Sequence, residues 1–157
     1  MRNAICALAF LGLPLLGASS QLWAEPLRPG DRLPAPEGFG PASPCIKHMG
    51  VHYVRKDEWP LGPILGYDEK GNLAFLEYMV SQKDLAEGVS WENLPGIAGR
   101  QIDHITIHFH PKGHRGYEVP HYDIHLYFVK PEAVHGICPD GVPGAEHGPK
   151  VIRYPAR

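Results

Sequence analysis

The sequence predicts a mainly β domain, either an antiparallel β sandwich or barrel or an α+β domain with a dominant sheet, with two or three short helices. Three observations predict it. Two apolar segments flank the turn Asp68-Glu69-Lys70-Gly71 as in a β-hairpin. Residues 101–110 and 121–129 alternate polar and apolar side chains as half-buried strands do. The segments that suit a helix are all short.

The first 24 residues have the pattern of a secretory signal peptide. Arg2 precedes an apolar run over residues 4–17, and a stretch with small residues, which ends in Leu22-Trp23-Ala24, follows it. The apolar run is shorter than the roughly 20 residues of a membrane-spanning helix. We therefore expect cleavage after Ala24, with Ser19 or Ser20 as the alternative, and a periplasmic or secreted protein without a membrane span.

Residues 25–44 are rich in proline and glycine and have no apolar period, so they are predicted to form an extended arm. Residues 45–157 are predicted to form a single β-rich domain, because a chain of this length suits one core. Its first strand is expected at residues 49–54, and the hairpin at residues 64–67 and 72–80.

The second half of the domain is predicted to combine short helices with the two clearest strands. Ser81 suits an N-cap and Gly88 a helix C-terminus, so a helix is expected over residues 82–87. The strands over 101–110 and 121–129 follow, joined by a ten-residue loop. The remaining expectations are helical turns at residues 90–94 and 132–135 and a last strand at residues 150–154.

Charge and cysteine content limit the function classes. Cleavage would remove Arg2, leaving 14 of the 15 basic residues against 17 acidic ones, a formal charge of −3 with neutral histidines. This balance argues against nucleic acid as a partner, because that would need a basic face. Cleavage would also leave two cysteines, Cys45 and Cys138, and an exported protein with such a pair is expected to join them in a disulfide.

Residues 104–125 hold six of the ten histidines. Alternate residues of a strand point to opposite faces, so one face of the two strands carries His104, Thr106, His108 and His110 with His121, Asp123, His125 and Tyr127. A hairpin with residue sums near 231 places His110 opposite His121, and His108 opposite Asp123. The other face carries apolar side chains and is predicted to be the core face.

This concentration of imidazole predicts a site for a divalent transition metal such as zinc, copper, iron or nickel. Residues four apart on a strand are about 13 Å apart at Cα, so His121 and His125 should not share an ion. Partners are therefore expected from other segments. The predicted ligands are His52, Glu77, His114, His121 and His125, and Asp123 and His108 are predicted to make supporting contacts to them.

Three motifs of this chain resemble those of a known protein family. They are CIKHMGVHY at residues 45–53, HPKGH at residues 110–114 and PHYDIHLYF at residues 120–128. The chain thereby resembles an uncharacterised family of secreted bacterial proteins with a Met-Gly-x-His element and a Pro-His-(Phe/Tyr)-Asp-x-His-x-Tyr signature. The resemblance implies no activity. As site residues, it favours Met49, Gly50, His52, His114, His121, Asp123 and His125 over His104 and His110.

Other function classes stay open at this point, including whether the protein is an enzyme. A metal-free small-molecule-binding or lyase-like barrel could use Asp123, His125 and Glu77 as acid, base and hydrogen-bonding groups. An envelope interaction protein could instead carry histidines that only titrate. Exposed sheet edges would also suit a homo-oligomer.

Overall fold

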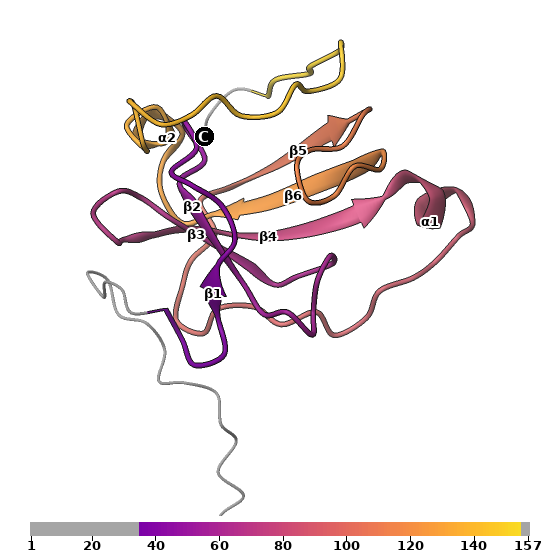
Figure 1. Cartoon of the computed structure of the whole chain (residues 1–157), viewed down its shortest axis with the longest axis horizontal. Coiled ribbons are helices and arrows are strands. Elements are labelled where there is room, and N and C mark those ends of the chain that lie inside the picture. Colours follow the sequence, from indigo (N-terminus) through magenta and orange to yellow (C-terminus); the bar gives the residue numbers. More distant parts are fainter. Residues whose placement is uncertain (1–34, 155–157) are drawn as a thin grey trace, which may run out of the picture.

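A computed structural model describes residues 35–154 of the chain. The elements are β1 (Gly40–Pro41), β2 (Val51–Val54), β3 (Ile64–Tyr67), β4 (Leu73–Ser81), α1 (Gln82–Ala86), β5 (His104–His110), β6 (His121–Tyr127) and α2 (Pro131–Val134). The strands form one antiparallel sheet in the order β1-β2-β3-β4-β6-β5. Figure 1 shows the long strands β4, β6 and β5 side by side, with α1 at the end of β4.

The predicted mainly β fold with antiparallel strands is confirmed, and the described helices are two and short. The strand at residues 64–67 has its predicted bounds, and the other long strands lie within three residues of theirs. The sheet is open within residues 35–154, because its order starts at β1 and ends at β5 without a pairing between them. The described part of the chain is therefore neither a closed barrel nor a sandwich of two sheets.

Two minor predictions about irregular segments were wrong. Residues 150–154 form no strand, and residues 90–94 form no helical turn. The last segment buries little, since Val151 and Ile152 are 52% and 69% exposed. Without buried apolar surface, little offsets the entropy cost of ordering a strand.

The predicted register of the main hairpin is confirmed. His110 lies opposite His121, His108 opposite Asp123, and Thr106 opposite His125. On its other edge β6 pairs with β4, which places Glu77 opposite His125. β4 is a central strand whose residues 73–80 are all buried, in keeping with its nearly continuous apolar sequence.

The prediction of which face is buried was wrong for β5 and β6. The two isoleucines expected in the core, Ile105 and Ile107, are 57% and 61% exposed. On the other face His121, Asp123 and His125 are fully buried. Strand parity sorts side chains between two faces, but it does not say which face the rest of the chain covers.

The covering segments explain this arrangement. On the isoleucine side, loop residues Phe39, Leu61 and Ile97 pack on a cluster around Leu65 and Leu76, in the middle of the sheet. On the histidine side, the segment after α2 lies against the end of β5, where the N–H of Gly148 donates to the carbonyl of Phe109. Figure 1 shows this segment running along the β5 side of the sheet.

The two cysteines join the start of the domain to its end. Cys45 and Cys138 form a disulfide, with their Cα atoms 5.8 Å apart, which is the predicted pairing. A second apolar cluster surrounds it and contains Ala74, Phe75 and Ile137. The described part of the arm also joins the fold, because β1 pairs with β2. The predicted signal peptide and arm residues 25–34 lie outside the described residues.

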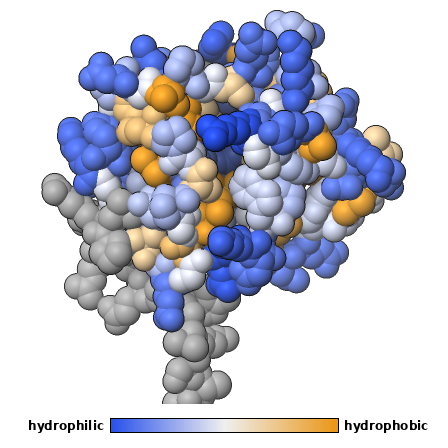
Figure 2. Space-filling model, in the orientation of Figure 1, coloured by the Kyte–Doolittle hydropathy of each residue, from blue (hydrophilic) through white to orange (hydrophobic). Residues whose placement is uncertain are grey.

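The helices and the surface complete the fold. The hydroxyl oxygen of Ser81 accepts a hydrogen bond from the N–H of Asp84 at 3.0 Å, which is the predicted N-cap. Figure 2 shows a face on which hydrophobic residues gather only in small groups among hydrophilic ones. Within residues 35–154 no helix is long and apolar enough to cross a membrane.

Candidate metal centre

The buried polar face of the sheet divides into two groups of potential metal ligands. The first histidine group is His52, Glu77 and His125, and the second histidine group is His114, His121 and Asp123. Within each group, one ligand atom per residue lies within 4.8 Å of the others. A tetrahedral ion with bonds of about 2.1 Å holds its ligands about 3.4 Å apart, so modest side-chain rotations would close either group around an ion.

Three strands supply the first histidine group. β4 carries Glu77 beside His125 of β6, and β2 adds His52. The Nε2 atom of His52 lies 3.3 Å from Oε2 of Glu77, and Nε2 of His125 lies 3.7 Å from the same oxygen. This oxygen and both ring nitrogens of His125 are buried without a hydrogen-bond partner. Burying such polar atoms unpaired costs several kcal/mol, which a bound cation would offset.

Ser43 fixes which nitrogen of His52 faces the carboxylate. Its hydroxyl donates to the carbonyl of Pro44 at 2.9 Å and accepts the backbone N–H of His52. The same hydroxyl oxygen lies 3.0 Å from Nδ1 of His52. While the hydroxyl proton goes to Pro44, this oxygen accepts a proton from Nδ1, and Nε2 faces Glu77 as the free ring nitrogen. The same logic orients ligand imidazoles in metalloproteins.

Phe75 packs the two imidazoles of the first group in place. Its ring contacts His125 edge to face at a centroid distance of 4.8 Å, and His52 at 5.5 Å. Gly66 leaves the room for this ring, since a Cβ atom there would lie 2.1 Å from a Phe75 ring atom. A glycine and an aromatic ring on neighbouring strands thus shape the site without contributing a ligand.

The second histidine group is built around the carboxylate of Asp123. Nε2 of His121 lies 3.0 Å from Oδ1, and Nε2 of His110 lies 2.9 Å from Oδ2. The ring of His114, from the loop between β5 and β6, stands perpendicular to that of His121 at a centroid distance of 4.7 Å. His110, His121 and Asp123 are 0% exposed, and His114 is partly exposed.

Burial and charge act in opposite directions in this group. Burial alone would raise the pKa of Asp123, but the imidazoles of His110 and His121 outweigh it and hold that pKa well below its usual range. Burial would lower the pKa of His121, yet Asp123 and the carbonyl of Val119 together raise it. The buried carboxylate of Asp123 therefore stays charged between these imidazoles.

Two further imidazoles, those of His108 and His147, lie beside the two histidine groups. The two rings stack at a centroid distance of 3.8 Å. Burial, and then the charge of His147, lower the pKa of His108 to about 4. Burial likewise lowers the pKa of His147. Both rings are therefore neutral near pH 7, and they cover the histidine face rather than neutralise its carboxylates.

The comparisons with known proteins support the fold but assign no activity. The chain is similar to the crystal structure of the hypothetical protein TTHB210 from Thermus thermophilus, with a TM-score of 0.56 and 28% sequence identity. The match covers 62% of this chain and 93% of that one. No family model and no curated protein matches the chain.

The structure gathers the predicted ligands on one face but separates them. His52, Glu77 and His125 lie together, while His114 and His121 lie in the other group. His121 and His125 thus belong to different groups, as the strand spacing predicted. Asp123, predicted to support a ligand, is the centre of the second group, and His108 stacks on His147 and contacts the ring of His125 edge to face at 5.8 Å.

Sequence reasoning missed two histidines of this face. His110 was disfavoured as a site residue but is completely buried, and His147 was interpreted as an ordinary loop residue but stacks on His108. The predicted register, which placed His110 opposite His121, was the signal that could have included His110. No local pattern marks His147, because only the path of the last segment brings it onto the sheet.

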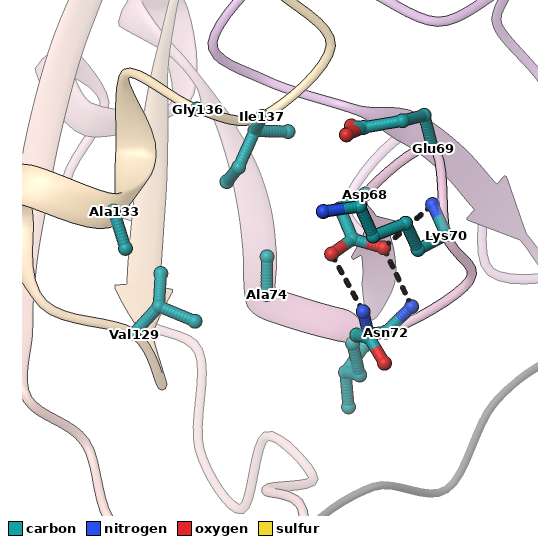
Figure 3. A pocket seen from close by; sticks show the side chains of 10 residues that line it. Asp68, Glu69, Lys70, Asn72, Ala74, Val129, Ala133, Gly136 and Ile137 are labelled. Carbon is teal, nitrogen blue, oxygen red and sulfur yellow. Dashed lines mark hydrogen bonds between the residues drawn. The ribbon is translucent and has the colours of Figure 1, made fainter.

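A separate hollow of about 230 Å³ does not have the chemistry of a site. Figure 3 shows it beside the turn after β3, where Asp68 accepts hydrogen bonds from Lys70 and Asn72. The carboxylate of Glu69 accepts the N–H of Cys138 at 2.8 Å. These acids are therefore occupied in shaping the turn, which leaves the histidine face as the candidate centre.

Proposed function

We propose that this is an exported protein that binds a divalent transition metal in the first histidine group. One observation carries the proposal: two imidazole nitrogens converge on a single buried oxygen of Glu77 that has no hydrogen-bond partner. Two imidazoles and a carboxylate are a ligand set for zinc, copper, nickel or iron, whereas calcium and magnesium prefer oxygen.

Further support comes from the positions of the ligands. All three lie on paired strands of one sheet, and Phe75 and Ser43 hold the rings. Ligands held by strands lose little entropy when the ion binds. Three protein ligands would leave a coordination position for water or a small molecule, which is the arrangement of catalytic rather than structural zinc sites.

Export is proposed from the leader-like sequence of residues 1–24 and from the disulfide, since disulfides persist in oxidising compartments. Membership of the secreted bacterial family with the Pro-His-(Phe/Tyr)-Asp signature is proposed on the motifs at residues 45–53, 110–114 and 120–128.

The proposal is tested with untagged protein stripped of metal by a chelator and titrated calorimetrically with Zn²⁺. We expect the wild type to bind zinc, and His52→Ala and Glu77→Gln each to remove one equivalent. His104→Ala is the matched control, because His104 stacks on Tyr127 outside both groups. A wild type that binds neither zinc, copper, nickel nor iron would refute the proposal, as would unchanged stoichiometry in both variants.

A further inference from the structure

We propose that Asp123 centres a second metal site, in which His110 joins His114 and His121 as a ligand; together with the proposed function, this gives the sheet face two ions. This site shares no ligand with the first histidine group. The inference goes beyond the proposed function and would stand if the first group bound nothing.

The protonation of the buried rings of His110 and His121 supports this site. Nδ1 of His121 lies 2.7 Å from the carbonyl oxygen of Val119, and Nδ1 of His110 lies 3.2 Å from that of Glu146. A carbonyl oxygen only accepts, so each Nδ1 atom carries a proton. In both rings Nε2 is therefore the nitrogen left to bind a cation, and both Nε2 atoms face the carboxylate of Asp123.

The contacts to Asp123 lack the geometry of hydrogen bonds. Both Nε2 atoms and both carboxylate oxygens are buried without a hydrogen-bond partner, although each nitrogen is within 3.0 Å of an oxygen. The two rings are inclined by 25° with centroids 5.3 Å apart, and each directs Nε2 to a different oxygen of the carboxylate. Four buried atoms that converge without satisfying one another are the arrangement expected of ligands to a shared ion.

His114 gives this site a third imidazole and an opening to solvent. It comes from a tight loop in which its N–H and carbonyl pair with those of Tyr117. A hollow of about 220 Å³ lined by Pro111–Gly113, Ala145 and Glu146 lies beside it, at the end of β5 where His110 stands. An ion here can exchange with solvent, whereas the first histidine group is buried throughout.

The spacing along β6 makes these two sites mononuclear. Asp123 and His125 are two residues apart on one face of a strand, about 7 Å at Cα. Metal ions bridged in dinuclear centres are about 3.5–4 Å apart. The structure therefore favours two independent ions with unlike ligand sets, one with two imidazoles and a glutamate, the other with three imidazoles and an aspartate.

The test uses the double variant His52→Ala/Glu77→Gln, which lacks the first group, so that only the second can bind. Calorimetric titration of the stripped protein with Zn²⁺ is expected to give one equivalent. Adding His114→Ala or His110→Ala should weaken this binding by about tenfold or more, a loss comparable to or larger than that of supporting residues, while His104→Ala should leave it unchanged.

The controls separate this inference from the proposed function. Because His114 is partly exposed, its replacement should preserve the fold, which circular dichroism checks. A folded double variant that binds no zinc overturns the second site, and so does one whose affinity resists both His110→Ala and His114→Ala. If instead the wild type binds one ion that is lost in Asp123→Asn and retained in His52→Ala, the second site stands and the first fails.

Discussion

Single hydroxyls and glycines decide how the histidine rings of this protein are presented. Ser43 is the clearest case, because its hydrogen bonds leave Nε2 of His52 as the nitrogen that faces Glu77. A residue outside the first histidine group therefore determines which nitrogen of His52 can bind the metal. No spacing rule reveals this, since Ser43 lies in a loop nine residues before the histidine that it orients.

We predict that Ser43→Ala weakens zinc binding at the first histidine group by about tenfold, the lower end of the effect of losing such a partner. The reason is that His52 would rotate or change tautomer. Calorimetric titration measures the affinity, and Ser90→Ala, at an exposed position, is the control. Equal affinity in Ser43→Ala and wild type would show that the hydroxyl does not set the ring.

Gly66 acts at the same scale through space rather than hydrogen bonds. We predict that Gly66→Ala lowers the free energy of unfolding by about 1–3 kcal/mol, the usual cost of overpacking, because the new methyl would overlap the ring of Phe75. Urea denaturation of the metal-free protein measures this. Gly96→Ala is the control, since a Cβ atom at Gly96 would meet no atom within 4 Å.

At the scale of elements, sequence reasoning succeeded where the signal is local. Period-two alternation located β5 and β6, and the register of the hairpin followed from the pairing of their ends. It failed on burial, because covering a face depends on segments distant in sequence: Phe39, Leu61 and Ile97 on one side and the last segment on the other. The ligand types could be predicted, but their division into two groups needed the strand order β2-β3-β4-β6.

The exposed isoleucines of β5 allow a test of which face of the sheet is buried. We predict that Ile107→Thr changes the free energy of unfolding by no more than about 0.5 kcal/mol, as expected at a surface position. Leu76→Thr, on the same face but 2% exposed, should cost several times more because it places a hydroxyl in the core cluster. Chemical denaturation of the two variants compares them directly. Similar losses would mean that Ile107 is covered.

For the whole molecule, the disulfide closes a long segment of the chain around the sheet. Cys45 and Cys138 are separated by 93 positions, so the cross-link restricts most of the unfolded domain. We predict that the double variant Cys45→Ala/Cys138→Ala loses about 2–4 kcal/mol of stability. Thermal denaturation compares it with wild type under oxidising conditions. If reducing agent destabilised the double variant as much as it destabilises wild type, the assignment of a disulfide between Cys45 and Cys138 would be wrong.

Metal binding should also stabilise the whole fold, because both histidine groups join strands that are distant in sequence and exist only in the folded state. A free zinc concentration of about 100 times the dissociation constant stabilises a protein by about 2.7 kcal/mol per site. We predict that zinc raises the Tm of the wild type, raises it less in His52→Ala or Asp123→Asn, and does not raise it when both substitutions are combined. Magnesium at the same concentration should have no effect, because it prefers oxygen ligands. Thermal scans of the four proteins with zinc, magnesium or chelator measure these shifts, and an equal rise in all four would place the bound zinc outside the histidine face.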